Sequence, residues 1–123
     1  VKGDGGKYID EQTQDMLSIL GAKTDLRANE GKGYCLFLTK GFLEEASGEG
    51  EQCLSGELEP EKTFYEVKSQ GYAGGNSCSI LIAGSEYALN AEGINWVVYN
   101  NRLNKVIDCV AFNTHQENIA AVR

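Results

Sequence analysis

The stretch EGINWVVYNNRLNKVIDCVAF, residues 92–112, decides the fold class of this chain. It contains two apolar runs, 94–99 and 105–112, which are separated by a polar segment rich in Asn. Runs of this length that are rich in Val, Ile and aromatic residues are typical of β-strands, and the polar segment can turn the chain. We therefore predict a β-hairpin over this stretch.

Side chains alternate between the two faces of a strand, so the first run places Ile94, Trp96 and Val98 on one face. Val97 and Tyr99 then lie on the other face. Because both faces are apolar, we expect a central strand that is covered on both sides, with Trp96 in the core.

Outward from this hairpin, the chain is predicted to be β-rich with one main helix. Further strands are expected at 34–39, 63–68 and 78–83, with a shorter one at 86–89. The helix is expected at 10–20, with Asp10 as its N-cap, Gly21 as its stop, and one face formed by Thr13, Met16, Leu17 and Leu20. The pattern predicts a single α+β domain, 1–123, with a sandwich-like sheet arrangement.

A Glu-rich stretch, 42–61, separates the early strand from the later ones, and we interpret it as an acidic, solvated linker. Its acids lack the alternating register of a calcium loop, so neither a metal nor another cofactor is expected. His115 is the only imidazole, and it would pair with the Cys109 thiol only if the tail folded back. We therefore expect a non-catalytic protein.

The composition limits the partners. A net charge of −7 repels polyanions, which argues against a nucleic acid or an anionic membrane surface. No apolar run approaches the ~18 residues that span a bilayer, so membrane insertion is not expected. Val1 stands where an initiator Met would, and we interpret the chain as a processed or excised piece.

The four cysteines are Cys35, Cys53, Cys78 and Cys109. An even number in a small chain favours two disulfides and an oxidising, extracellular compartment. The alternative is four buried thiols in a cytosolic protein.

The tail after the hairpin allows two interpretations. Thr114 and Glu117 have the capping-box spacing of a helix start, whereas IAAV, 119–122, has the composition of a strand.

Two parts of the chain resemble the interleukin-like EMT-inducer (PANDER-like) family. The hairpin resembles that family's hairpin at Gly93, Ile94, Asn95, Asn100, Lys105, Val106, Ile107, Asp108, Phe112 and Thr114, with Asn104 in place of the usual turn Gly. NSCSILIAGSEYALN, 76–90, resembles the segment before it, so that 62–123 is similar to the family's N-terminal half. Residues 1–41 are similar to its C-terminal half.

The reversed order of the halves implies a circular permutation, or one period cut from a tandem array. IAAVR and VKGDGG, at the two ends, would then be parts of one severed strand. Each part would be completed by the other or by a neighbouring copy.

The resemblance also implies roles for single residues. It favours a Cys53–Cys78 disulfide, and Cys35 and Cys109 would bridge if their strands face each other. One relative is lectin-like and binds a β-linked N-acetylglucosamine through an Asp and an Arg. The matching positions here are Asp4 and Gly31, where the neighbouring Lys32 would replace the Arg, and Tyr34 or Tyr8 would stack on the sugar ring.

The family therefore implies a non-catalytic extracellular carbohydrate-binding domain. One alternative is a structural subunit or repeat of an extracellular fibre or array, assembled by strand completion between copies. A second alternative is a secreted ligand for a cell-surface receptor.

Overall fold

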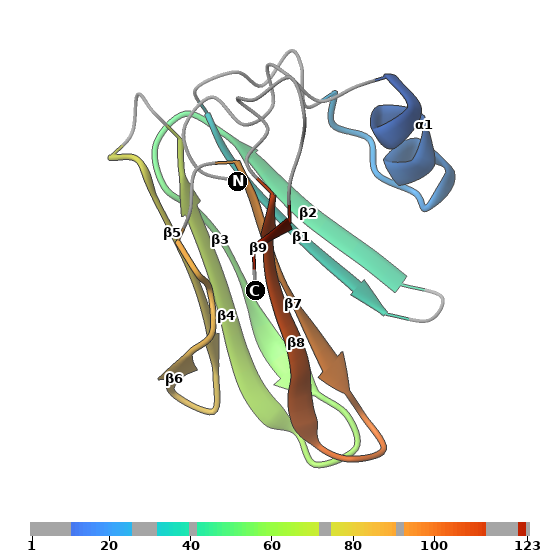
Figure 1. Ribbon diagram of the computed structural model, residues 1–123, viewed down its shortest axis with the longest axis vertical. Helices are drawn as coiled ribbons and strands as arrows, with labels where there is room; N and C mark the ends of the chain where they lie inside the picture. Colours follow the sequence, from blue (N-terminus) through green and yellow to red (C-terminus); the bar gives the residue numbers. More distant parts are fainter. Residues whose placement is uncertain are drawn as a thin grey trace.

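The computed structural model describes residues 11–25, 32–39, 42–71, 75–90, 93–112 and 121–122. Within these ranges the protein is a β-rich α+β domain with antiparallel strands and one short helix (Figure 1). The elements are α1 (Glu11–Ile19), β1 (Gly33–Thr39), β2 (Phe42–Gly48), β3 (Gln52–Leu58), β4 (Thr63–Gln70), β5 (Ser77–Ile82), β6 (Ser85–Glu86), β7 (Ile94–Asn100), β8 (Lys105–Phe112) and β9 (Ala121–Val122).

The strands form three sheets, with the orders β1-β2, β3-β4-β5-β6 and β7-β8-β9. The predicted hairpin is confirmed as β7 and β8, and the helix and three further strands are confirmed as α1, β1, β4 and β5. The short strand predicted at 86–89 overlaps β6 at Glu86 only. β9 pairs with β8 through Ala111 opposite Val122, so the strand interpretation of the tail holds there. The capping box at Thr114 and Glu117 lies outside the described residues.

Local chemistry explains the turn between β7 and β8. Asn100 accepts hydrogen bonds through Oδ1 from the backbone N–H groups of Arg102 and Leu103, at 2.9 and 3.0 Å. Asn104 has a φ of 51°, a left-handed conformation that Asn tolerates better than most residues. The turn therefore closes the hairpin without a glycine.

The helix also ends as predicted. Gly21 has a φ of 110°, and its N–H donates to the Ser18 carbonyl while the Ala22 N–H donates to the Leu17 carbonyl. These two bonds form a Schellman motif, in which Gly avoids the steric cost of the left-handed conformation. The next residue, Ala22, is buried.

The sheet of β3, β4 and β5 has two chemically different faces, because side chains alternate along each strand. Its register places one set on an inner face: Leu54, Gly56, Leu58, Tyr65, Val67, Ser69, Cys78, Ile80 and Ile82. The outer face carries Cys53, Ser55, Glu57, Phe64, Glu66, Lys68, Ser77, Ser79 and Leu81.

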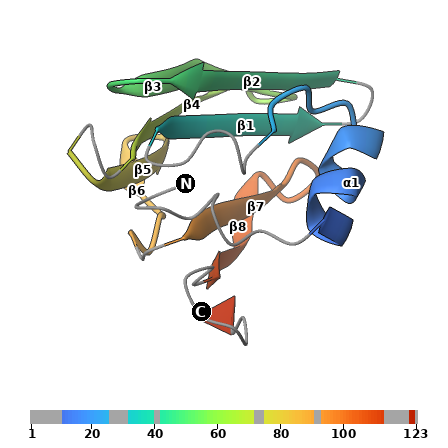
Figure 2. The same ribbon diagram turned by 90° about the horizontal axis from the view of Figure 1, so that it is seen from above.

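Two other elements cover the inner face (Figure 2). From β1, Phe37 stacks on Tyr65 with ring centroids 4.5 Å apart and the planes 11° from parallel. From the hairpin, Val97, Tyr99 and Val106 pack against a buried cluster of Leu58, Tyr65 and Ile82. The core therefore lies between the β3-β4-β5 sheet and the β7-β8 hairpin, with β1 at one side.

The linker interpretation of 42–61 is wrong, because this stretch forms β2 and β3. In β3 the apolar Leu54 and Leu58 alternate with the polar Ser55 and Glu57. Glu44, Glu45 and Glu57 are strand residues, and the remaining glutamates of the stretch lie in the short connections that flank β3.

The expectation for Trp96 is also wrong. Trp96 is 49% exposed and Val98 is 43% exposed, although Ile94 on the same face packs against the buried Tyr34. Val97 and Tyr99, on the other face, pack against the cluster of Leu58, Tyr65 and Ile82. β7 is an edge strand of its sheet in the described part of the chain, rather than a central one.

Candidate functional site

A cavity of about 510 Å³ lies between the inner face of the β3-β4-β5 sheet, β1 and β7. Its walls are mainly aliphatic and aromatic, including Phe37, Tyr65, Val67, Ile80, Val97 and Tyr99. This volume is within the range of small-molecule pockets, which are typically ~300–1,000 Å³ and mostly apolar. The two layers therefore leave space that their own side chains do not fill.

Large apolar side chains continue from the cavity to the surface. Met16 of α1, Leu38 of β1, Phe42 of β2 and Trp96 of β7 all line the cavity, and they are 45–56% exposed. We call these four residues the mouth. They come from α1, the β1-β2 hairpin and β7, which are distant in sequence, so the fold brings these three parts to the cavity. Leu38 and Phe42 lie on opposite faces of their hairpin. Exposed apolar groups beside an apolar cavity are typical of a binding site.

One polar part of the cavity lies at the start of β1. Other polar residues that line the cavity are Thr39, Glu57, Glu59, Lys68, Asn95 and Asn101. The backbone N–H of Tyr34 donates to Ser69 Oγ at 3.0 Å, and the Tyr34 hydroxyl donates to Glu45 Oε2 at 2.7 Å. Tyr34 is 6% exposed, and both Tyr34 and Ser69 line the cavity. Burial, together with the hydrogen bond to Glu45 and its negative charge, raises the pKa of Tyr34 well above its ordinary value. Tyr34 is therefore a neutral donor.

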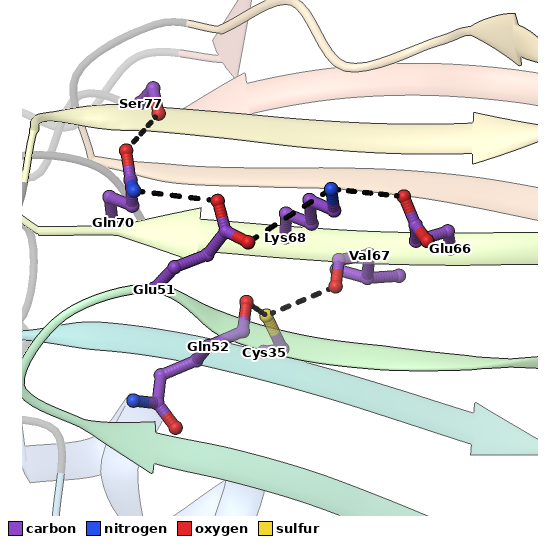
Figure 3. Close-up of polar contacts among 8 residues, drawn as sticks. All are labelled: Cys35, Glu51, Gln52, Glu66, Val67, Lys68, Gln70 and Ser77. Carbon is purple, nitrogen blue, oxygen red and sulfur yellow. Dashed lines mark hydrogen bonds and ion pairs between the residues drawn. The ribbon is translucent and has the colours of Figure 1, made fainter.

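Beside this polar end lies a buried thiol. The Cys35 sulfur is 3.4 Å from the Gln52 carbonyl oxygen and 3.6 Å from that of Val67 (Figure 3). Burial raises the pKa of Cys35 to about 12. Because the thiolate is the reactive form, this cysteine is suited to packing and not to nucleophilic chemistry.

The outer face of the same sheet carries a polar network in place of a cavity (Figure 3). Lys68 Nζ lies 3.4 Å from Glu66 Oε1 and 3.9 Å from Glu51 Oε1. Gln70 donates to Glu51 at 3.4 Å and accepts from the Ser77 hydroxyl at 3.0 Å. These groups satisfy one another at the surface.

The predicted sugar-binding residues are only partly described. Asp4 and Tyr8 lie outside the described residues, as do Gly31 and the two chain ends, Val1 and Arg123. Lys32 is partly exposed, immediately before β1. Tyr34, two residues later, has its ring buried against the cavity, not open on the surface.

The predicted disulfides are not observed, because all four cysteines are described and none of them forms a disulfide. Cys53 lies opposite Lys68 on the outer face, whereas Cys78 lies opposite Ser69 on the inner face. A Cys53–Cys78 bond would have to cross the sheet. Cys35 packs on the backbone of β3 and β4, and Cys109 lies opposite Val97 in the β7-β8 hairpin.

The alternative of four buried thiols holds for Cys35 and Cys78 only. Cys53 is exposed and Cys109 is partly exposed. The redox compartment stays a prediction.

Neither a metal cluster nor a membrane-spanning helix is found among the described residues. They contain no group of three or more His, Cys, Asp and Glu side chains placed to hold a metal ion. Among them, too, no helix is long and apolar enough to cross a membrane.

Several residues of the cavity and its surroundings were missed by sequence reasoning. Glu45 was part of an acidic run, although its partners Tyr34 and Lys23 lie 11 and 22 residues away. Ile80 and Val67 were recognised as strand residues, but not as walls of a cavity. No local signal identifies either role, because each depends on which strands meet.

Comparison with protein-family models, curated proteins and solved structures finds no match to this chain. The resemblance to the interleukin-like EMT-inducer family therefore stays a prediction.

Proposed function

We propose that this protein is a binding module that takes an elongated apolar ligand into the cavity between its β-layers. The single observation that supports this is the apolar cavity of about 510 Å³ with a mouth of exposed apolar side chains. Moving a hydrocarbon from water into such a space gives about 25 cal/mol per Å² of apolar surface buried. An acyl chain or an aromatic hydrocarbon has this chemistry.

The polar groups at the start of β1 indicate how a ligand would be oriented in the cavity. Tyr34 and Ser69 already bond to protein groups, as does Glu45, which accepts from Tyr34. A charged head group placed there would be desolvated without a partner of its own. The ligand's apolar part should therefore lie inside, with any polar group at the mouth.

Fluorescence tests the proposal directly. Trp96 is the only Trp of the chain, and it lies at the mouth. Titration with a long-chain alcohol or fatty acid, below its critical micelle concentration, should shift the emission of Trp96 to the blue and saturate at one ligand per chain. If no apolar probe gives a saturable change, the proposal fails.

Two neighbouring residues of β5 provide a matched pair of variants. Ile80 lines the cavity, and Leu81 lies on the opposite face of the sheet. Ile80→Phe adds volume inside the cavity and should weaken binding by roughly tenfold or more. Leu81→Phe makes the same type of change outside the cavity and should leave the affinity unchanged.

Glycan binding is the second candidate. The observation in its favour is Lys32, which is partly exposed immediately before β1, whereas the Tyr34 ring is buried and not open to a sugar on the surface. A glycan array with the wild type and Asp4→Ala tests it, and the absence of binding by the wild type ends it. The Ile80→Phe variant separates the two candidates, since a sugar held by Asp4 and Lys32 would not need the interior.

The finer fold assignment belongs with these proposals. A permuted sandwich of the interleukin-like EMT-inducer type is consistent with the layers of β3-β4-β5 and β7-β8. An extracellular location, a receptor ligand and assembly by strand completion stay predictions.

A further inference from the structure

α1 makes a narrow contact with the rest of the described protein. Its Leu17 packs beside Tyr34, and Met16 and Leu17 line the cavity. On the other hand, Met16, Ile19 and Leu20 are 56%, 85% and 47% exposed. The helix therefore forms part of the cavity wall without having a large buried face of its own.

One carboxylate ties the segment after α1 to the sheet. Glu45 of β2 accepts a hydrogen bond from the Lys23 N–H through Oε1 and another from the Tyr34 hydroxyl through Oε2. Thr24 also bonds to Glu45, and its hydroxyl lies 3.4 Å from the Ser47 hydroxyl. Glu45 thus joins the segment after α1 to both strands of the first hairpin.

The segment is also tied back to the helix. Gln14 Nε2 donates to the Thr24 carbonyl at 3.1 Å, and the Schellman bonds at Gly21 and Ala22 fix the direction in which the chain leaves α1. A displacement of residues 23–24 is therefore transmitted to the helix.

Electrostatics agree with this arrangement. Burial by itself would raise the pKa of Glu45, but hydrogen bonds from Lys23, Tyr34 and Thr24 outweigh it, so the pKa lies below its ordinary value. Hydrogen bonds to an ionised carboxylate are shorter and stronger than those between neutral groups.

We propose that Glu45 is a latch that positions α1 over the cavity mouth and thereby sets how fast an apolar ligand enters and leaves. Met16 and Leu17 have to move aside for a ligand to pass that wall. The latch is independent of the proposed function, whereas its effect on ligand exchange rests on that function.

The test uses Glu45→Gln in the full chain, which keeps the side-chain volume and removes the charge. The matched control is Glu44→Gln, because Glu44 is exposed and points to the opposite face of the same strand. A charge-assisted hydrogen bond is worth roughly tenfold in an equilibrium constant. We expect amide hydrogen exchange in residues 16–24 to be roughly tenfold faster in Glu45→Gln only, with β3, β4 and β5 unchanged.

Stopped-flow measurement of Trp96 emission gives the second readout. Association and dissociation of a long-chain alcohol should both accelerate several-fold in Glu45→Gln, so that Kd changes little. A residue with only a structural role would change Kd or the stability of the whole sheet instead. Thr24→Val removes a weaker contact of Glu45 and should produce the same changes in hydrogen exchange and ligand rates, but smaller ones. This variant replaces Glu45→Gln in the test if Glu45→Gln does not fold.

The hydrogen-exchange and stopped-flow results test the Glu45 contacts, the role of α1 in ligand access and the proposed function separately. Equal exchange of residues 16–24 in Glu45→Gln, Thr24→Val and the wild type overturns the latch. Faster exchange with unchanged ligand rates overturns the role of α1 in ligand access. If no variant binds any apolar probe, the proposed function fails and so does the claim about ligand rates, while hydrogen exchange still decides whether Glu45 holds α1.

Discussion

Phe64 and Tyr65 are adjacent aromatic residues of β4 that occupy opposite environments. Tyr65 is 6% exposed and stacks on Phe37, whereas Phe64 is 51% exposed on the outer face. The same contrast extends over the β3-β4-β5 sheet, which has the cavity and core on its inner face and the Lys68 network on its outer face. Two side chains that are adjacent along a strand therefore lie in different environments, one in the apolar core and the other in contact with water.

The contrast shows where burial stabilises this protein and where the proposed binding site lies. Apolar groups gain free energy only where another layer covers them, and β1 and β7 cover the inner face alone. The polar pairs of the outer face are screened by water and contribute little. A comparison of matched positions on the two faces is therefore the most direct way to test the structure.

The largest difference is expected in the rates at which two thiols react with a thiol reagent. Cys53 is exposed on the outer face, while Cys35 is buried with a pKa of about 12. At pH 8 roughly one Cys35 side chain in 10⁴ is a thiolate, and opening of the protein is needed as well. With a thiol reagent such as DTNB, Cys53 should react at least ~10³-fold faster than Cys35, as followed by mass spectrometry of the labelled peptides.

This measurement also tests the free thiols themselves. Denaturation should release four reactive thiols per chain from protein that has never been reduced. If protein purified under oxidising conditions shows no reactive thiols after denaturation, the two predicted disulfides are supported. The sheet register at Cys53 and Cys78 is then contradicted.

The next largest effect is expected in stability. Tyr65→Ala removes a buried ring that stacks on Phe37, and it should lower the free energy of unfolding by about 3 kcal/mol. Phe64→Ala should lower it by no more than about 0.5 kcal/mol, because half of that ring is already in water. Urea unfolding followed by circular dichroism measures both. Equal losses would mean that the outer face is covered in solution.

Sequence reasoning located most elements of this fold because each has a strong local period. The strand at 105–112 has the predicted bounds, and the helix predicted at 10–20 is observed at Glu11–Ile19. The Glu-rich stretch 42–61 failed because its glutamates obscured the alternation of Leu54, Ser55, Gly56, Glu57 and Leu58. The abundance of Glu in this stretch suggested a loop, whereas its alternation of apolar and polar residues indicates a strand.

The candidate site was much less predictable for a physical reason. Alternation shows that Trp96 and Val97 point to opposite faces, but not which face another layer will cover. The cavity needs β1, β4 and β7 to meet, and these strands are separated by long stretches of chain. The Glu45 contacts depend on the β1-β2 hairpin and on the segment after α1, which the sequence pattern did not pair. A single sequence contains no local signal for such contacts.

A smaller loss of stability is expected at the closest approach of β1 to the β3-β4-β5 sheet. A Cβ on Gly33 would overlap the backbone carbonyl oxygen of Ser69, which cannot rotate away. Gly33→Ala should therefore cost about 1–3 kcal/mol in the free energy of unfolding. A Cβ on Gly56 would instead meet the ring of Tyr65 at 3.0 Å, and a side chain can shift. Gly56→Ala should cost less, and the reverse order would show that β1 is not held against Ser69.

The smallest effect is expected on the outer face, where Lys68 lies between Glu66 and Glu51. The neighbouring Glu66, and then Glu51, raise the pKa of Lys68 above its ordinary 10.5, so any stabilisation is present at neutral pH and is lost as the pH rises through the raised pKa. Solvent screening makes such pairs weak, and Lys68→Met should leave the urea midpoint unchanged at pH 7 in low salt. A clear drop in the midpoint that disappears in high salt would show that the network acts cooperatively. The outer face would then stabilise the sheet by charge in the way that the inner face does by burial.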